Sequence, residues 1–162
     1  MFLTCKFMGK EIEHKYIVND KSFKDLASES HNIKQGYLCK DKERTVRIRI
    51  IDTKAFITIK GETHGDTRVE YEYPIPLDDA KSMLDSLCIG PVIEKTRYIV
   101  TYKGNNWEID MFEGFLEGLI LAEIEIPSSD YKYDIPPFVG KNVTNDPRYY
   151  NSNLSNIPDI YK

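Results

Sequence analysis

The sequence predicts a mainly β domain with few helices, whose antiparallel strands form a barrel or a strongly curved sheet. Three observations predict this fold class. Apolar and polar residues alternate with period two along most of the chain, only two stretches have helical spacing, and short turn sequences separate neighbouring strand candidates. The 162 residues are enough for one domain with a substantial core.

The predicted elements follow from these patterns in chain order. Seven segments alternate like strands, at residues 11–18, 45–51, 55–60, 68–75, 95–102, 107–112 and 119–126. Turns at 52–54 and 103–106 predict antiparallel hairpins. Helical spacing is found at 22–30 and at 78–88, where acidic residues occupy the first turn. The Pro-, Asn- and Tyr-rich chain from Ser128 predicts a wrapping segment with one short helix near 146–153.

Composition argues against several classes of protein. A formal charge of −4 and a pI of 5.4 argue against a general nucleic-acid or membrane-surface binder. No apolar run reaches the 18 residues of a membrane span, and the opening segment lacks the pattern of a signal peptide. Cys5, Cys39 and Cys88 are odd in number and far apart, so we expect buried thiols in a cytoplasmic protein.

Nearly every predicted strand has one apolar face and one charged face. In the strand 45–51, Arg47 and Arg49 share one face, and Val46, Ile48 and Ile50 share the other. A half-solvated sheet whose charges face water is the simplest interpretation. The same sorting places on the charged face Glu11, Glu13, Lys15, Lys60, Arg68, Glu70, Glu72, Lys95, Arg97, Glu108, Asp110, Glu123 and Glu125.

Two features favour a ligand-binding surface over simple solvation. The charged face holds four of the six arginines but only three of the sixteen lysines, and arginine is favoured where a rigid fork meets phosphate or carboxylate oxygens. Like charges also recur two residues apart in five strands, which is repulsive unless a ligand compensates. We infer a surface that binds a polyanion and metal ions, and that becomes a charged tunnel if the sheet closes.

Several motifs on these strands resemble those of one family. The Glu11-x-Glu13-x-Lys15 motif resembles the signature of the CYTH superfamily, the triphosphate tunnel metalloenzymes. Further segments resemble the family's motifs in the same order, namely 35–38, 44–49, 58–61, 68–72, 93–98, 107–114, 118–125 and 143–151. The resemblance implies a closed eight-stranded antiparallel β-barrel tunnel with helices packed outside. It also implies one domain at 11–162, including a C-terminal closing segment, after an N-terminal extension at 1–10.

The resemblance implies divalent-metal-dependent hydrolysis of inorganic tripolyphosphate to diphosphate and phosphate, with Mg²⁺ or Mn²⁺ as cofactor. The candidate phosphate ligands are the cations of the charged face, Lys15, Arg47, Arg49, Lys60, Arg68, Lys95 and Arg97. We expect Glu11 and Glu13 to hold one metal, because Mg²⁺ prefers oxygen ligands. The resemblance adds Asp110, Glu123 and Glu125 to the metal site. Glu70 and Glu72 are supporting residues that either pair with arginines or contact metal.

The resemblance also assigns residues to proton transfer. In bacterial inorganic triphosphatases of this family, the tyrosine that corresponds to Tyr37 is proposed to accept a proton together with the signature lysine, here Lys15. Packing is the competing interpretation of Tyr37. Glu108 lies on the same strand face as the site residues, but it is not included among them.

Substrate choice is judged from the aromatic residues. Trp107 alternates with the charged residues of its strand, so we expect it to point outward into the core. The inward face then offers no aromatic platform for a nucleobase. We therefore expect tripolyphosphate to be preferred over ATP at least tenfold. The alternatives are a class IV-type adenylate cyclase, a thiamine or nucleoside triphosphatase, and a non-catalytic polyphosphate-binding module. We expect a small anionic substrate and no nucleic-acid or membrane partner, and we leave a homodimer open.

Overall fold

The computed structural model describes residues 9–154, so the Cys5 thiol and most of the predicted N-terminal extension lie outside the described residues. The strands and helices of this part are β1 (Lys10–Val18), α1 (Phe23–Leu26), β2 (Glu29–Asp41), β3 (Arg44–Ile51), β4 (Lys54–Gly61), β5 (Thr67–Ile75), α2 (Leu77–Ser86), β6 (Ile93–Tyr102), β7 (Asn105–Phe112), β8 (Ile120–Glu125) and β9 (Val139–Asn142). Two 3₁₀ turns are η1 (Gly114–Leu116) and η2 (Pro147–Tyr149).

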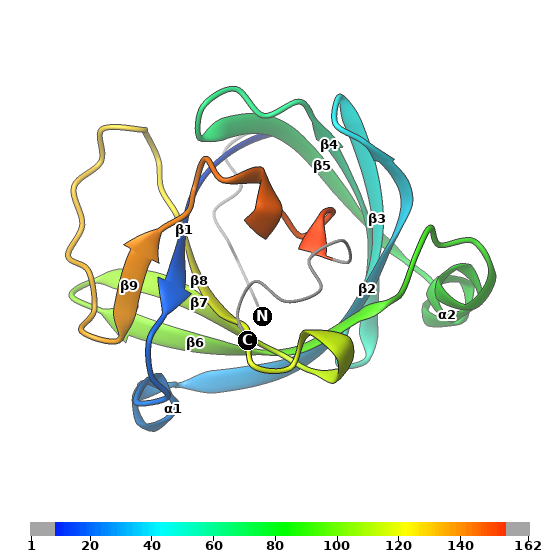
Figure 1. Ribbon diagram of the computed structural model, residues 1–162. Helices are drawn as coiled ribbons and strands as arrows, with labels where there is room; N and C mark the ends of the chain where they lie inside the picture. Colours follow the sequence, from blue (N-terminus) through cyan, green and yellow to red (C-terminus); the bar gives the residue numbers. More distant parts are fainter. Residues whose placement is uncertain (1–8, 155–162) are drawn as a thin grey trace.

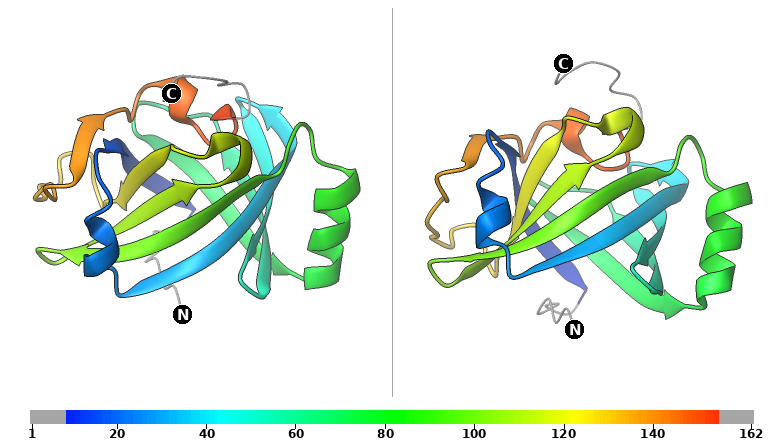
Figure 2. Two further views of the ribbon diagram at one scale, coloured as in Figure 1. Left: turned by 60° about the horizontal axis from the view of Figure 1, so that its bottom comes forward. Right: turned by 90° about the horizontal axis from the view of Figure 1, so that it is seen from below.

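The strands form one antiparallel sheet that closes on itself (Figure 1). Their order is β5-β4-β3-β2-β6-β7-β8-β1-β9. The first residues of β1 also pair with β5, with Glu11 opposite Arg68, which joins eight strands into a ring and leaves β9 on the outside of β1. The predicted closed eight-stranded antiparallel barrel with outer helices is confirmed (Figure 2).

One predicted element is shorter in the structure, and two strands, β2 and β9, were not predicted. The helix expected at 22–30 covers only Phe23–Leu26, and the strand β2, which the sequence analysis missed, begins at Glu29. The alternation of β2 is hard to recognise because its inner face mixes His31 and Gln35 with apolar residues, and Gly36 interrupts its outer face. A Cβ atom at Gly36 would lie 2.5 Å from the Cys88 sulfur, so the close approach of the chain after α2 requires glycine here.

Apolar side chains cover the outside of the barrel in two places. One cluster includes Tyr16, Trp107 and Ile124 and is completed by Phe23 of α1 and by Phe138. The second lies under α2, where Ala80 and Leu84 pack on the outer faces of β3 and β4. Because the outward side chains form these cores, the inward side chains of the same strands are free to be polar.

A third apolar cluster lies inside the barrel and fills one end of it. It consists of inward side chains near the strand ends and residues of the C-terminal segment, namely Tyr37, Ile93, Phe112, Leu116, Leu119, Leu121, Val143, Tyr149 and Leu154. Residues 143–154, orange to red in Figures 1 and 2, cross this end of the barrel. The backbone N–H of Val143 donates to the carbonyl of Lys15 at 2.8 Å, which ties the segment to β1. The barrel interior therefore has a closed floor and an open mouth.

Candidate functional site

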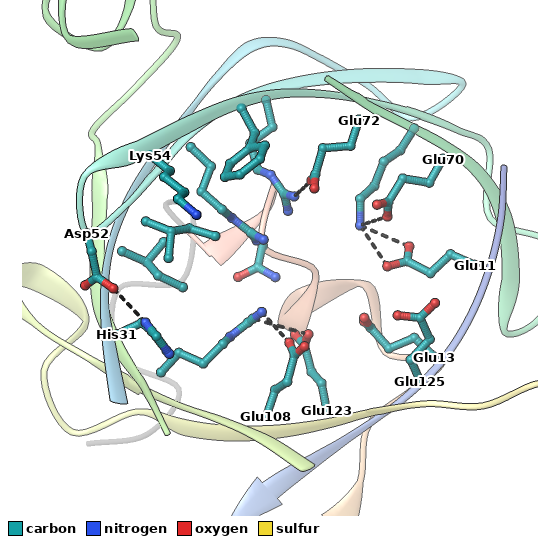
Figure 3. Close-up of a pocket in the computed structure, with 18 of the residues that line it drawn as sticks. Glu11, Glu13, His31, Asp52, Lys54, Glu70, Glu72, Glu108, Glu123 and Glu125 are labelled. Atoms are coloured by element: carbon teal, nitrogen blue, oxygen red, sulfur yellow. Dashed lines mark hydrogen bonds and ion pairs between the residues drawn. The ribbon is translucent and has the colours of Figure 1, made fainter. Parts of the chain in front are cut away.

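The inward charged side chains surround a cavity of about 450 Å³ above this floor (Figure 3). Cross-strand register brings them together, because directly paired residues on one face lie side by side. Eleven of the predicted site residues line the cavity, namely Glu11, Glu13, Arg47, Arg49, Lys60, Arg68, Glu70, Glu72, Arg97, Glu123 and Glu125. Four others do not line it: Lys95 and Asp110 are almost fully buried, Tyr37 belongs to the floor, and Lys15 lines a small adjoining cavity of about 40 Å³.

One side of the cavity, which we call the arginine side, is formed by Arg47 and Arg49 of β3. Arg49 Nε donates to the Gln35 side-chain oxygen at 3.1 Å, and Arg47 Nη2 donates to Thr58 Oγ1 at 3.2 Å. Arg47 Nε and the Gln35 amide nitrogen are buried without an acceptor among the described residues. Burial and the neighbouring Arg47 and Arg97 lower the pKa of Arg49 to about 10. The positive charge of the two guanidinium groups that line the cavity suits an anion.

The opposite side, which we call the carboxylate side, is formed by Glu11, Glu13 and Glu125. Glu13 and Glu125 are direct cross-strand partners in β1 and β8, and no ion pair or hydrogen bond to either carboxylate is found within residues 9–154. Burial, together with Glu123 and Glu11, raises the pKa of Glu13 well above its usual value. Burial and the neighbouring carboxylates raise the pKa of Glu125 to about 7, although its side chain lies at the exposed end of β8. This side requires protons or a cation.

Lys60 bridges two acidic residues at the edge of the carboxylate side. Its ammonium nitrogen lies 3.0 Å from Glu11 Oε2 and 3.1 Å from Glu70 Oε2 (Figure 3). Arg68 Nε contacts Glu11 at 3.3 Å. Glu72 accepts a hydrogen bond from Thr58 Oγ1 at 2.8 Å and lies 3.7 Å from Arg47 Nη2. Both supporting glutamates therefore contact cations of the site, which is one of the two arrangements expected for them.

A layer of complete ion pairs lies deeper in the barrel. Arg97 donates to both Asp110 oxygens at 2.7 and 2.8 Å, and the Lys95 ammonium donates to Asp110 at 2.5 Å. Burial lowers the pKa of Lys95 to about 7. Burial alone would raise the pKa of Asp110, but Arg97 and Lys95 outweigh it and hold the pKa low. Glu108, which the sequence analysis left out, also pairs with Arg97 and lines the cavity.

The signature lysine belongs to the same deep layer. The Lys15 ammonium lies 3.1 Å from Glu123 Oε1 and donates to the Tyr149 carbonyl at 3.1 Å. Burial opposes the charge of Lys15, but Glu123 and Glu13 outweigh it and raise its pKa. Tyr37, the cross-strand partner of Arg47, packs in the floor. Lys15 thus lies between the carboxylate side and the segment that closes the barrel.

The mouth of the cavity is apolar on one wall. Ile33, Ile51 and Phe56 line it, together with the polar side chains of His31, Asp52, Thr53 and Lys54. No inward aromatic platform for a nucleobase was expected, yet the ring of Phe56 lines the cavity. Phe56 lies two and four residues before Thr58 and Lys60, so alternation along the strand already places it on the same inward face. Trp107, in contrast, is fully buried against Tyr16 and Tyr133 outside the barrel, as expected.

A divalent cation was expected at the carboxylates. In the part of the chain that the structure describes, no three acidic, histidine or cysteine side chains are clustered closely enough to hold a metal by themselves. The donor set nevertheless fits Mg²⁺ or Mn²⁺, because Mg²⁺ is usually bound through one or two carboxylates, with water and substrate phosphate oxygens as the other ligands. Glu13 and Glu125 provide carboxylates that no cationic side chain of residues 9–154 contacts.

No helix among the described residues is long and apolar enough to cross a membrane. The expected cytoplasmic location, the domain boundaries and the homodimer stay predictions.

Comparisons with known proteins give consistent results. The CYTH domain family matches residues 9–161. An inorganic triphosphatase of Acetivibrio thermocellus is 46% identical over 151 residues, covering 93% of this chain and 96% of the relative. An inorganic triphosphatase of Nitrosomonas europaea is 36% identical over 149 residues, covering 90% and 96%. The crystal structure of the inorganic triphosphatase NE1496 has a TM-score of 0.65 at 32% identity, covering 90% of this chain and 93% of that one.

Proposed function

The chain belongs to the CYTH domain family, and from this premise we propose that it hydrolyses inorganic tripolyphosphate to diphosphate and phosphate inside the barrel. The family match confirms the resemblance of the sequence motifs, and two relatives of nearly the same length are inorganic triphosphatases. The proposed activity is that of a phosphoanhydride hydrolase with a small anionic substrate.

The observation that carries the proposal is the division of charge within one cavity. Among the described residues, the arginine side has donors without acceptors, and two acids of the carboxylate side, Glu13 and Glu125, have no cation partner. A phosphate chain alone would satisfy only the first side, and a metal ion alone only the second. A metal–triphosphate complex satisfies both, because the metal can share phosphate oxygens with the carboxylates.

We assign the phosphate-binding role to the inward cations. Arg47 and Arg49 line the cavity with open or weakly engaged donors and are placed to make charge-assisted contacts with phosphate oxygens. Lys60, Arg68 and Arg97 line the same cavity and must exchange part of their carboxylate contacts for phosphate. Lys15 and Lys95, which are held by Glu123 and Asp110, contribute charge from beneath.

We assign the divalent metal, Mg²⁺ or Mn²⁺, to Glu11, Glu13 and Glu125, with Asp110 and Glu123 as deeper acidic groups of the same site. When bound, the metal supplies positive charge on the phosphate oxygens and lowers the pKa of a bound water. Because Asp110 and Glu123 contact lysine and arginine, their contribution is to orient those cations. Glu70 and Glu72 support Lys60 and Arg47.

We propose that Lys15 and Tyr37 act together in removing the proton of the attacking water. The Lys15 ammonium is fixed by Glu123 and by the Tyr149 carbonyl, so its position does not depend on substrate. The Tyr37 side chain lies in the floor across from Arg47, on the inward face of β2. Since a neutral phenol donates rather than accepts, Tyr37 would have to reach the cavity as a phenolate to take the proton directly.

A phosphate-release assay tests the function. Purified full-length protein is given tripolyphosphate with Mg²⁺ or Mn²⁺, and the products are separated by ion-exchange chromatography. We expect equal amounts of diphosphate and phosphate, loss of activity in Glu13→Gln, and full activity in Glu117→Gln, whose side chain is exposed near η1. Binding of tripolyphosphate without turnover would instead favour the polyphosphate-binding module, and cyclic AMP formed from ATP would favour the adenylate cyclase.

A further inference from the structure

The barrel is closed by a short seam between β1 and β5. Three residues of β1, beginning at Lys10, pair with β5, and the last of them, Ile12, lies opposite Thr67, where β5 begins. Beyond them, the Glu13 backbone N–H donates to the Asp66 carbonyl at 3.2 Å. The register thus continues one residue beyond β5, and Asp66 holds the backbone of a residue of the carboxylate side.

The side chain of Asp66 holds the outer face of β1 at the same place. Asp66 Oδ2 lies 2.8 Å from His14 Nε2, and Asp66 Oδ1 accepts a hydrogen bond from Ser129 Oγ at 2.7 Å. On the other edge of the imidazole, His14 Nδ1 lies 2.6 Å from the Tyr133 hydroxyl, which lies 2.5 Å from the Tyr16 hydroxyl. An ionised Asp66 accepts from the Nε2–H group, which leaves Nδ1 to accept from Tyr133. We call these five residues the outer network.

Aromatic packing fixes one end of the outer network. The rings of Tyr16 and Tyr133 pack against Trp107 with centroid distances of 5.6 and 5.7 Å, and Trp107 is fully buried. The other end differs, because the side chains of His14 and Asp66 are 18% and 17% exposed. Hydrophobic packing therefore holds the two tyrosines, whereas directional hydrogen bonds hold His14 and Asp66.

The outer network joins the three segments that carry the carboxylate side and its neighbour Arg68. His14 follows Glu13 in β1, and side chains alternate across the barrel wall, so the imidazole lies outside and the Glu13 carboxylate lines the cavity. Asp66 directly precedes β5, which carries Arg68. The segment that follows β8, which ends at Glu125, supplies the serine and one tyrosine of the network. The network is therefore placed to fix the position of Glu13 relative to Glu125 from outside the barrel.

Such a fixed position matters because Glu13 and Glu125 repel each other. They are direct cross-strand partners without a cation partner within residues 9–154, and like charges in this arrangement push their strands apart. A divalent cation needs its carboxylate ligands close together. A network that resists the repulsion from outside reduces the cost of ordering the site when the cation binds.

We propose that Asp66 and His14 are positioning residues of the metal site, which hold Glu13 in place through β1 without contacting the metal or the substrate. This inference rests on the proposed function, because it concerns the carboxylates to which the metal is assigned. The affinity for a divalent cation then depends on a hydrogen bond on the outer face of β1, across the barrel wall from the cavity.

The test compares matched variants of the full-length protein. Asp66→Ala and His14→Ala, alone and together, remove the two ends of one hydrogen bond and leave the Asp66 carbonyl in place. His14→Gln keeps a side chain that can donate to Asp66 and accept from Tyr133. Glu62→Ala is the control, because it removes an acidic side chain from the same loop, where it makes an exposed ion pair with Lys42.

Three quantities are measured for each protein. Mn²⁺ binding is followed by electron paramagnetic resonance, both without substrate and with bis-methylene triphosphate, whose carbon bridges are not hydrolysed. Tripolyphosphate hydrolysis over a range of Mg²⁺ concentrations gives the half-saturating Mg²⁺ concentration and kcat at saturating metal. Thermal melts give the stability.

We expect Asp66→Ala and His14→Ala each to weaken Mn²⁺ binding about tenfold, which corresponds to about 1.4 kcal/mol, and to raise the half-saturating Mg²⁺ concentration to a similar degree. Their kcat at saturating Mg²⁺ should change less than twofold. The double variant should bind Mn²⁺ no more weakly than either single variant, because both residues act through one hydrogen bond. His14→Gln and Glu62→Ala should match the original protein.

Unchanged Mn²⁺ affinity in both alanine variants would overturn the proposal, while the proposed function stands. A loss in His14→Gln as large as that in His14→Ala would also overturn it, and so would a fall in kcat at saturating metal that parallels the melting temperature, because the network would then only stabilise the barrel. Mn²⁺ binding that depends on Asp66 in a protein that does not hydrolyse tripolyphosphate would support the proposal and refute the proposed function instead.

Discussion

The arginine side and the carboxylate side of the cavity lie a few strands apart and are incomplete in opposite ways. Within residues 9–154, Arg47 Nε and the Gln35 amide nitrogen lack acceptors, whereas Glu13 and Glu125 face each other without a cation. In the deep layer between floor and cavity, by contrast, Asp110 and Glu123 are fully paired with lysine and arginine. The difference teaches that the uncompensated carboxylates, Glu13 and Glu125, line the cavity that a ligand enters, whereas the charges of the deep layer are compensated by the protein itself.

This contrast also separates residues for binding from residues for structure. Unpaired charges on the cavity wall cost stability in the free protein, because like charges repel and their partners are absent. Paired charges in the deep layer hold the fold, since removing one partner of a buried pair leaves the other uncompensated. Substitutions on the two kinds of position should therefore have opposite effects on stability.

The largest effect is expected at the carboxylate side. Glu13→Gln removes a metal ligand at nearly constant volume and should reduce tripolyphosphate turnover at least a hundredfold, as should Glu11→Gln. The melting temperature of the metal-free Glu13→Gln protein should be unchanged or higher, because a repelling charge is lost. Steady-state kinetics over a range of Mg²⁺ concentrations and thermal melts check both results. Near-normal turnover at low Mg²⁺ would remove Glu13 from the metal site.

Two arginine substitutions should separate the cavity wall from the deep layer. Arg47→Ala should weaken tripolyphosphate binding about 10- to 100-fold, as expected from losing charge-assisted contacts, with no loss of stability. Arg97→Ala should also weaken binding but destabilise the protein by about 3–5 kcal/mol, because Asp110 loses its bidentate partner. Calorimetry and denaturant unfolding measure the two quantities. Equal stability of the two variants would contradict the division into layers.

A smaller effect is expected at Gln35, which positions Arg49. Gln35→Met removes the acceptor that Arg49 Nε uses and costs about 1 kcal/mol of substrate binding, or about fivefold in affinity. Stability should change little, since the Gln35 amide nitrogen already has no acceptor in the part of the chain that the structure describes. Calorimetric titration with tripolyphosphate tests this prediction. The titration is made with Gln35→Met and with a second variant, Gln35→Glu. An unchanged affinity in Gln35→Met would show that Arg49 needs no support from β2.

The smallest effect concerns the pH dependence of stability without metal. The pKa of Glu125 is about 7 in the folded protein, above its ordinary value of 4.5, so the folded state binds more protons than the unfolded state in this interval. The stability of the protein in chelator should therefore fall as pH rises from about 4.5 to about 7. Glu125→Gln should flatten this fall in thermal melts. An identical pH profile in the variant would mean that burial and the neighbouring carboxylates do not raise the pKa of Glu125 in the folded protein.

Much of the fold could be predicted because most strands have one apolar face, which packs in a core, and one charged face, which points into the barrel. Alternation identified most strands and separated Trp107, on the outside, from Arg97 and Asp110, on the inside. The strand β2 escaped because its inner face combines His31, Ile33 and Gln35, which is neither apolar nor uniformly charged. The parity rule fails where the two faces do not differ in polarity.

The sequence predicts which charged residues point into the barrel, but not which of them pair with one another. The family resemblance implies Asp110 as part of the metal site, and register and depth bring it to Arg97 and Lys95. Phe56 was overlooked because only the Thr58 and Lys60 end of its strand was sorted by parity. Neither the depth of a residue along the barrel nor the curvature that closes the floor can be inferred from alternation alone.

The central claim is that one ligand, a metal–triphosphate complex, completes both sides of the cavity. Calorimetric titration of tripolyphosphate into the protein at a temperature where turnover is slow, with and without Mg²⁺, tests this claim most directly. We predict that Mg²⁺ and tripolyphosphate each raise the affinity for the other by the same factor, as linkage requires, and that Glu13→Gln abolishes this mutual effect. Identical tripolyphosphate affinities with and without Mg²⁺, after correction for the complex formed in solution, would contradict the account.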